Sequence, residues 1–173
     1  MGKVIGLIIA LVVFSLFFGV IEWLWPALPG RKREGRQLRT DLVYWFFTPL
    51  ISRTITRAAL FTVAIIGAVI FGKEVVQSHV AQGYGPVAAL PVGAQVLLTL
   101  VVGDFVAYWG HRFFHTGRLW KFHAIHHSSI HLDWLASTRL HPLNDVIMRA
   151  VQAIALLALG VPVKILAAYV PFL

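Results

Sequence analysis

Histidine is the residue type whose number and spacing in this sequence could do chemistry. The chain has eight histidines and seven carboxylate residues, and it has no cysteine. Without cysteine there is no disulfide, no thiolate nucleophile and no thiolate-ligated metal, so a metal ion would have to bind through histidine, aspartate or glutamate. Six of the histidines fall within one short segment, namely His111, His115, His123, His126, His127 and His131. His141 follows this segment, and His79 stands apart from it.

The spacing of these histidines predicts two metal-binding helical faces. His111 and His115 are four residues apart, so they project from one face of a helix. After a break at residues 116–117, three more histidines follow at positions i, i+3 and i+4, which are His123, His126 and His127. Imidazole suits iron, zinc, copper and nickel, and five imidazoles exceed one ordinary metal site. The pattern therefore favours two metal ions close together, with open positions where oxygen could bind.

Two further residues lie on the face of His111, one and two turns earlier in the chain. Asp104 is an ionisable residue within an apolar segment, which is unusual unless it has a function. It could accept an N–H from a ligating histidine, although pairing with an arginine would also explain it. Tyr108 could support the site in the same way, or it could be an aromatic residue at the membrane boundary.

The composition shows which elements must position these side chains. Of the 173 residues, 58% are hydrophobic and only 13% are charged, and the mean hydropathy is +0.78, which indicates an integral membrane protein. We expect an all-α, polytopic fold with about four transmembrane spans, at residues 4–25, 58–72, 92–108 and 146–173. The last span is interrupted by Pro162 and Lys164, so it could be two segments. Residues 31–39 are predicted to form a basic loop, and residues 41–55 an interfacial amphipathic helix.

The distribution of lysine and arginine predicts the orientation. Residues 30–57 hold seven of the fifteen basic residues, residues 110–150 hold five, and residues 73–91 hold one. The positive-inside rule places the two basic segments in the cytoplasm, which puts the histidines on the cytoplasmic face of what we expect to be a bacterial inner membrane. The formal net charge of +8 is then a topology signal, and we expect no nucleic-acid partner.

Several sequence motifs together resemble the membrane-bound fatty acid hydroxylase and sterol desaturase superfamily, in its bacterial branch. The motifs are His-Arg-Phe-Phe-His at 111–115, Lys-Phe-His-Ala-Ile-His-His-Ser-Ser at 121–129, Asp-Trp at 133–134 and Arg-Leu-His-Pro at 139–142. The resemblance covers residues 100–150 firmly and the preceding spans more loosely. It implies a non-haem enzyme with two iron ions that uses O2 to hydroxylate or desaturate a C–H bond of a lipid.

The resemblance also implies the ligands and the partners. His111, His115, His123, His126 and His127 take the ligand positions, and His141 matches a recurrent position of the family. His131 and His79 match no such position. The lipid substrate would be a fatty acyl, sterol or carotenoid-like chain, and the electrons would come from a donor protein.

The resemblance divides the chain into an amino-terminal transmembrane region, residues 1–95, and a fatty acid hydroxylase-like domain, residues 96–173. The superfamily implies a third His-x-x-His-His box, which these 173 residues do not contain. The expectation is therefore that the sequence is an amino-terminal piece of a longer protein.

Two other classes of protein would also carry histidines in a polytopic chain. A metal-ion transporter should place histidine or carboxylate ligands within its spans, whereas here Asp104 is the one such residue in a predicted span near the cluster. A membrane cytochrome of the b type needs one histidine on each of two facing spans, which adjacent His126 and His127 do not serve.

Overall fold

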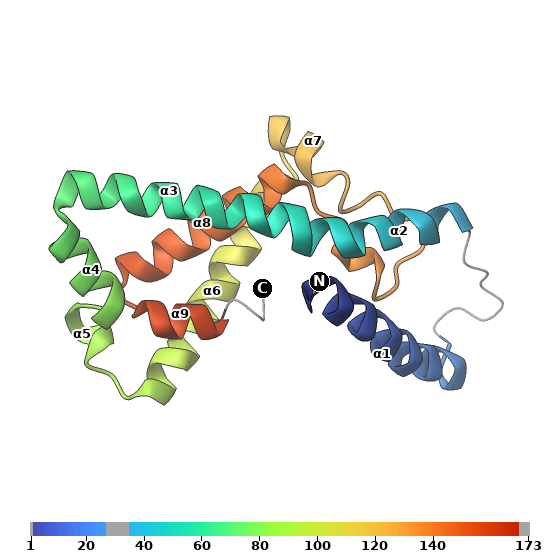
Figure 1. Ribbon diagram of the computed structural model, residues 1–173, viewed down its shortest axis with the longest axis horizontal. Coiled ribbons are helices and arrows are strands. Elements are labelled where there is room, and N and C mark those ends of the chain that lie inside the picture. The colour runs from blue at the N-terminus through green and yellow to red at the C-terminus, as the bar shows by residue number, and fades with distance from the viewer. Residues whose placement is uncertain (1, 27–34, 170–173) are drawn as a thin grey trace.

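The computed structural model describes residues 2–26 and 35–169, and every regular element in these ranges is helical (Figure 1). The predicted all-α class is therefore confirmed. The longer helices are α1 (Gly2–Leu24), α2 (Gly35–Phe47), α3 (Arg53–Phe71), α4 (Lys73–Gln82), α6 (Val92–Phe114) and α8 (Pro142–Ala158). The shorter helices are η1 (Thr48–Ser52), α5 (Gly85–Ala88), η2 (Gly117–Leu119), α7 (Trp120–His123), η3 (Ala136–Thr138) and α9 (Val163–Tyr169).

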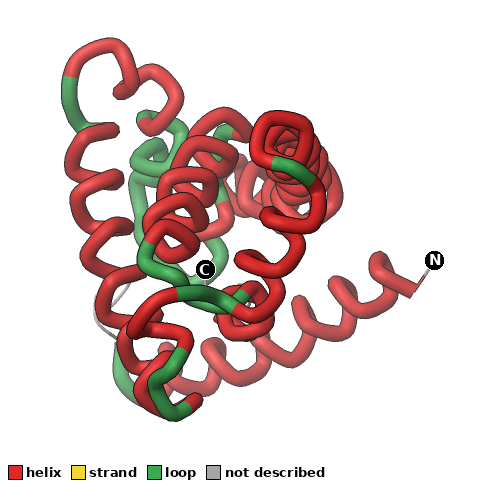
Figure 2. Tube along the Cα trace, turned by 90° about the vertical axis from the view of Figure 1, so that its left-hand side faces the viewer, coloured by secondary structure: helices red, strands yellow, loops and turns green. Residues whose placement is uncertain are grey.

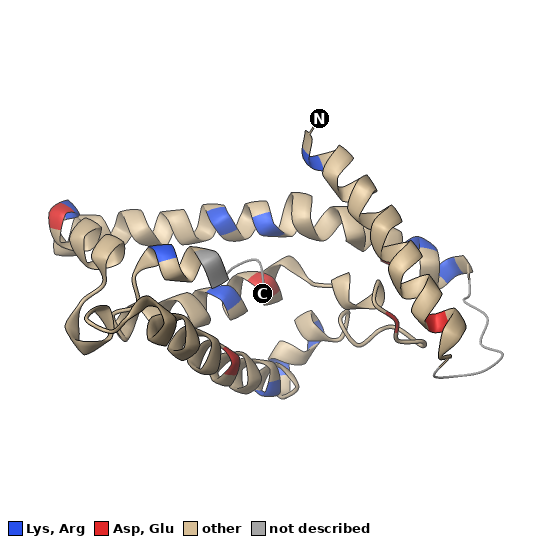
Figure 3. Ribbon diagram, turned by 90° about the horizontal axis from the view of Figure 1, so that it is seen from below, with Lys and Arg blue, Asp and Glu red and all other residues tan. Residues whose placement is uncertain are grey.

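Three helices are long and apolar enough to cross a membrane: Gly2–Leu24, Gly35–Phe71 and Val92–Phe114. They cover the first three predicted spans apart from Trp25 and Gly72, which lie just beyond the ends of α1 and α3. Charged residues are sparse along them (Figure 3). No residue of α1 is buried by the rest of the chain, as expected for a helix whose side chains contact lipid.

The predicted interfacial helix over residues 41–55 is helical, but it is not a separate element. α2, the π-helical turn η1 and α3 follow one another without a break, so that residues 35–71 form one helix of 37 residues. Pro49 has no amide hydrogen to donate, and the wider π turn accommodates this loss without ending the helix. At ~1.5 Å per residue the helix is ~55 Å long, which exceeds a hydrocarbon core of ~30 Å. Its polar α2 end must therefore extend beyond the membrane.

Part of the predicted basic loop also differs from the expectation. Residues 35–39 are the first residues of α2, and residues 31–34 lie outside the described part of the chain.

The fourth predicted span consists of two shorter helices, α8 and α9. Gly160, with a φ of 88°, and Pro162 separate them. A left-handed glycine followed by proline ends a helix because neither the backbone angle nor the missing N–H allows it to continue. α8 lies against both α3 and α6, and Leu156, Val161 and Leu166 form a small buried core with side chains of α6. α1 slants away from these helices (Figures 1 and 2).

The turn between α8 and α9 touches the turn after α4 closely. The amide of Tyr84 donates to the carbonyl of Gly160 at 3.2 Å, and the Tyr84 hydroxyl donates to the carbonyl of Ala158 at 2.6 Å. A Cβ atom added at Gly160 would lie 2.0 Å from the carbonyl oxygen of Tyr84. This contact fixes the carboxyl end of α8 and leaves no room for a side chain.

We expect Gly160→Ala to lower the free energy of unfolding by about 2 kcal/mol or more, because alanine would adopt a left-handed conformation and clash with Tyr84. Thermal unfolding of the purified protein in detergent measures the effect. Gly67→Ala is the matched control: it lies within α3 with no atom near the added Cβ, and it should be neutral or stabilise by about 0.5–1 kcal/mol. Equal stabilities of the two variants would contradict the contact.

Candidate metal centre

The carboxyl end of α6 carries the first pair of histidines. His111 lies in the last turn of the helix and His115 is its C-cap residue, so the two rings lie on one face as their spacing predicts. Their Nε2 atoms are 3.0 Å apart. The run of apolar residues in α6 thus ends where its first potential metal ligands begin.

A tight turn returns the chain to this pair. Gly117, with a φ of 55°, takes a conformation that favours glycine, and α7 follows it. Nε2 of His123 then lies 3.4 Å from Nε2 of His111 and 3.1 Å from Nε2 of His127. The predicted helical face is shorter than expected, because α7 ends at His123 and the chain continues as a turn.

Four imidazoles meet in one group, which consists of His111, His115, His123 and His127. One ligand atom from each lies within 4.8 Å of the other three. A metal ion with nitrogen ligands at about 2.0–2.1 Å would separate cis or tetrahedral ligand atoms by roughly 2.8–3.4 Å. The Nε2 separations of 3.0, 3.1 and 3.4 Å fall in this range, so the donor set fits one metal ion.

His126 lies beside this group, and its ring centroid is 5.4 Å from that of His123 and 5.9 Å from that of His111. Its Nδ1 bonds the backbone carbonyl of Arg139 at 3.2 Å. The Nδ1 of His123 bonds the side-chain oxygen of Asn144 at 3.0 Å. Because both partners are oxygen acceptors, both Nδ1 atoms carry the proton, and both Nε2 atoms keep a lone pair for a metal.

Burial favours the neutral, metal-binding form of His123 and His127. His123 is only 2% exposed, and burial lowers its pKa to about 4. The hydrogen bond to Asn144 opposes this shift, and the neighbouring histidines add to it. Burial also lowers the pKa of His127 below its ordinary value, helped by His126 and His115. A histidine that is neutral at physiological pH can ligate a metal without first losing a proton.

His141 lies outside the group of four. Its Nδ1 accepts the amide of Leu143 at 3.1 Å and so caps the amino end of α8, next to Pro142 at the first helical position. Its ring contacts Phe122, with 5.1 Å between ring centroids. The structure therefore gives His141 a capping contact that the sequence motif did not suggest.

Asp104 and Tyr108 take different places. Asp104 lines a cavity that also borders His111, His123 and His126, but within the described ranges it makes no hydrogen bond to an imidazole. Tyr108 is 54% exposed and accepts a hydrogen bond from Arg112 at 3.1 Å. The two other histidines lie apart from the centre: His79 bonds the carbonyl of Val75 in α4, and the backbone of His131 bonds Gln37.

The cavity beside the histidines has a volume of about 360 Å³ and lies between α6 and α8. Apolar side chains line part of it, including Ala107, Leu140 and Met148. Such a volume accommodates a segment of a small organic molecule. The cavity thus lies directly beside His111, His123 and His126.

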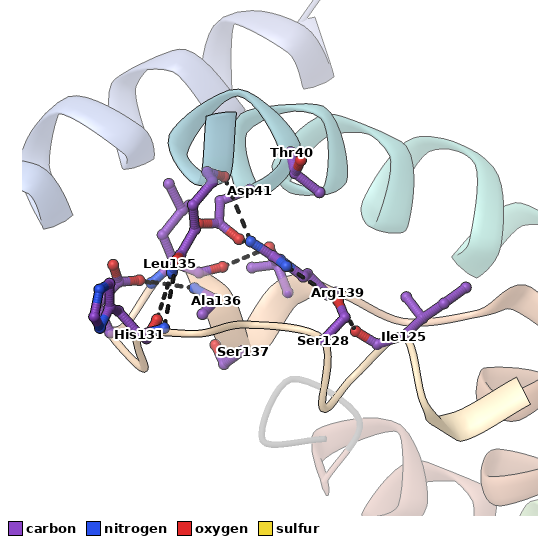
Figure 4. Close-up of polar contacts among 12 residues, drawn as sticks. Thr40, Asp41, Ile125, Ser128, His131, Leu135, Ala136, Ser137 and Arg139 are labelled. Carbon is purple, nitrogen blue, oxygen red and sulfur yellow. Dashed lines mark hydrogen bonds and ion pairs between the residues drawn. The ribbon is translucent and has the colours of Figure 1, made fainter. Parts of the chain in front are cut away.

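A buried ion pair ties the residues that follow the histidine cluster, residues 128–139, to α2 (Figure 4). These residues and the cluster together are called the histidine segment. Nε of Arg139 donates to a carboxylate oxygen of Asp41 at 2.5 Å, and the two side chains are 5% and 0% exposed. Arg139 also donates to the hydroxyl of Ser128 at 3.0 Å and to the carbonyl of Gln37. The backbone carbonyl of the same arginine is the partner of His126, so Asp41 holds the residue that orients this histidine.

An aromatic cluster attaches the same segment to α1. The indole of Trp134 lies 5.5 Å from the ring of Phe18, stacked on it, and 5.6 Å from Trp45 in an edge-on arrangement. Nε1 of Trp45 donates to the carbonyl of Leu7 at 3.0 Å. Residues from the first half of the chain therefore contact the loop that follows the histidines.

Sequence reasoning did not find Asn144, Asp41 or the structural part of Arg139. The positive-inside rule counts Arg139 among the five basic residues of segment 110–150, but its side chain is buried, at 4% exposure. The available signal was weak: Asp41 is a carboxylate in an otherwise aromatic segment, and its partner lies 98 positions away.

With this geometry in view, the class of the protein follows. Residues 96–173 match the fatty acid hydroxylase family, which supports the resemblance to the fatty acid hydroxylase and sterol desaturase superfamily that the motifs predicted.

Two characterised proteins are similar to part of the chain. The chain is 39% identical over 77 residues to the ornithine lipid hydroxylase OlsE of Rhizobium tropici. The aligned region covers 43% of this chain and 23% of that protein. It is 44% identical over 52 residues to methylsterol monooxygenase 2-1 of Arabidopsis thaliana, which covers 30% of this chain and 19% of that protein. The matched segment thus spans about a fifth of the length of these relatives. No solved structure matches the chain.

Proposed function

We propose that the protein is a membrane-bound, non-haem di-iron enzyme that hydroxylates or desaturates a C–H bond of a lipid with O2. The observation that carries the proposal is the group of four imidazoles, which borders a partly apolar cavity at the end of a membrane-spanning helix. The match to the fatty acid hydroxylase family and the similarity to a lipid hydroxylase and a methylsterol monooxygenase support a lipid substrate.

The four grouped histidines would hold one iron ion, and His126 would contribute to the second. Iron bound to imidazole ligands with open positions would supply the activation of O2 for oxidation of an unactivated C–H bond. Asn144 and the Arg139 carbonyl hold the protons on Nδ1 of their histidines and thereby fix the direction of each Nε2 lone pair. The apolar walls of the cavity exclude water and align the lipid chain.

The donor surface is also part of the proposal. Arg112, Arg118 and Lys121 are exposed basic residues of the segment that carries the histidines, and they would favour an acidic electron-donor protein.

Metal and product analysis test the proposed function together. The purified protein is expected to contain iron rather than zinc or copper, and its expression should add an O2-dependent product to the lipids of the host cell. Isotopically labelled O2 separates the two reactions, because hydroxylation places the label in the lipid and desaturation does not. Bound zinc without any O2-dependent lipid product would contradict the proposal.

The proposed orientation places the histidines on the cytoplasmic face and the α4–α5 segment on the other. Because the chain has no cysteine, single cysteines at Gly35, Ser78 and Arg118 can be labelled in intact cells with a membrane-impermeant reagent. All three positions are exposed and none has a positive φ. Labelling at Ser78→Cys alone is expected, and labelling at Arg118→Cys would reverse the topology.

A further inference from the structure

A second cavity lies on the other side of α8, between α3, α8 and α9. Its volume is about 240 Å³. Apolar side chains form much of its wall, among them Leu60, Ala153 and Leu166. Arg149 and Gln152 line both this cavity and the one beside the histidines. Side chains of α8 therefore separate the two cavities.

Three arginines line this otherwise apolar cavity: Arg53 and Arg57 from α3, and Arg149 from α8. Asp145 is the carboxylate beside them, and it is 3% exposed. One of its oxygens accepts the hydroxyl of Thr56 at 2.8 Å, and the other accepts Nε of Arg149 at 2.7 Å. Among the described residues, Asp145 thus bonds Arg149 and lies near Arg53.

Arg53 carries the excess positive charge. Its side chain is partly buried, and its Nε is a buried donor with no hydrogen-bond partner within residues 2–26 and 35–169. A buried donor without an acceptor is costly, and the cost is larger for a charged group. An anion in the cavity would supply the missing acceptor, and the fork of a guanidinium suits carboxylate and phosphate oxygens.

We propose that this cavity binds the acidic headgroup of a membrane lipid, with a carboxylate or phosphate at Arg53 and Arg57 and an apolar chain against Leu60 and Leu166. An acidic lipid satisfies both parts of the wall, since it joins an anion to an apolar chain. A free phosphate would satisfy only the arginines. Because Arg149 and Gln152 line both cavities, we assign the lipid bound here as the substrate, an assignment that rests on the proposed function. The substrate class is then an anionic lipid.

Lipid binding by the full chain, purified without metal, tests the site. The probes are dioleoyl phosphatidic acid and dioleoyl phosphatidylcholine, which share their chains and differ in headgroup charge. Native mass spectrometry measures how much of each lipid the protein retains. The wild-type protein is expected to retain phosphatidic acid about tenfold more tightly, because charge-assisted hydrogen bonds to the arginines are lost with the neutral headgroup.

The variant Arg53→Gln/Arg57→Gln is expected to lose this preference, whereas Arg118→Gln, an exposed arginine outside the cavity, should keep it. Circular dichroism confirms that the variants are folded. Leu60→Trp, which fills the cavity without removing a charge, should weaken phosphatidic acid binding as well. Inorganic phosphate added in excess should not displace the lipid.

Equal retention of the two lipids by the wild-type protein would overturn the site. So would an equal loss in Arg118→Gln, because it would show general attraction of acidic lipids to a basic surface. Displacement by inorganic phosphate would show that the apolar wall does not contribute. Since the binding assay needs no iron and no turnover, selective binding without any oxidation product would contradict the proposed function and leave the site intact. Oxidation of neutral lipids alone would support the proposed function and contradict the assignment of an anionic lipid as the substrate.

Discussion

Replacing His123 by alanine is expected to remove tightly bound iron and to lower lipid oxidation more than a hundredfold. His123 is the central member of the group, because its Nε2 lies within 3.4 Å of those of both His111 and His127. It is also the most deeply buried of the four histidines. Loss of a residue that only orients a ligand typically costs ten- to hundredfold, so loss of a ligand should exceed that range.

Two variants make this result specific. Asn144→Ala leaves the imidazole of His123 in place but removes its hydrogen-bond partner, so it should fall in the ten- to hundredfold class. His79→Ala removes a histidine of α4, far along the chain from the cluster, and should retain its iron and its activity. Inductively coupled plasma emission spectrometry measures the iron content, and mass spectrometry of the lipids measures product formation. An iron-replete His123→Ala protein would exclude this group as a ligand set.

Asp41→Ala is expected to destabilise the protein by about 3–5 kcal/mol, since it leaves the guanidinium of Arg139 buried without its carboxylate. Asp41 is fully buried, and the residue it holds supplies the carbonyl that bonds His126. We therefore expect weaker iron binding to accompany the loss of stability. Thermal unfolding and an iron titration of the same preparation measure the two effects.

A double-mutant cycle separates the ion pair from the individual side chains. If the pair acts as a unit, Asp41→Ala/Arg139→Ala should be destabilised by less than the sum of the two single variants, with a coupling of about 1–3 kcal/mol. Glu74→Ala, at an exposed position of α4, is the control and should change the stability by less than about 0.5 kcal/mol. Additive single effects would show that the pair contributes no interaction of its own.

The local part of this structure could be predicted from the sequence, because it depends on helical periodicity and hydropathy. The position of His111 and His115 at the end of a span follows from a four-residue spacing and an apolar run. The return of the chain at Gly117 follows from a residue that tolerates a positive φ. These features need only neighbouring residues to be specified.

The rest depends on contacts between distant residues. Which of the adjacent His126 and His127 joins the group of four is decided by the turn after α7 and by a carbonyl thirteen residues away. Pro49 interrupts the apolar character of residues 41–55, but a π turn accommodates its missing amide hydrogen, and the polar end of the helix then contacts the residues that follow the histidines. The spacing of residues along the chain cannot predict the packing of α2 against residues 128–139.

The attachment of the histidine segment to α1 and α2 also sets an order of assembly. Asp41, Trp45 and Phe18 all precede the histidines in the chain, so the surfaces that receive Arg139 and Trp134 leave the ribosome first. Once the early helices have inserted, the later loop can pack against side chains of α1 and α2 that are already in place. Metal loading can then be the last step of biogenesis, after the loop has docked.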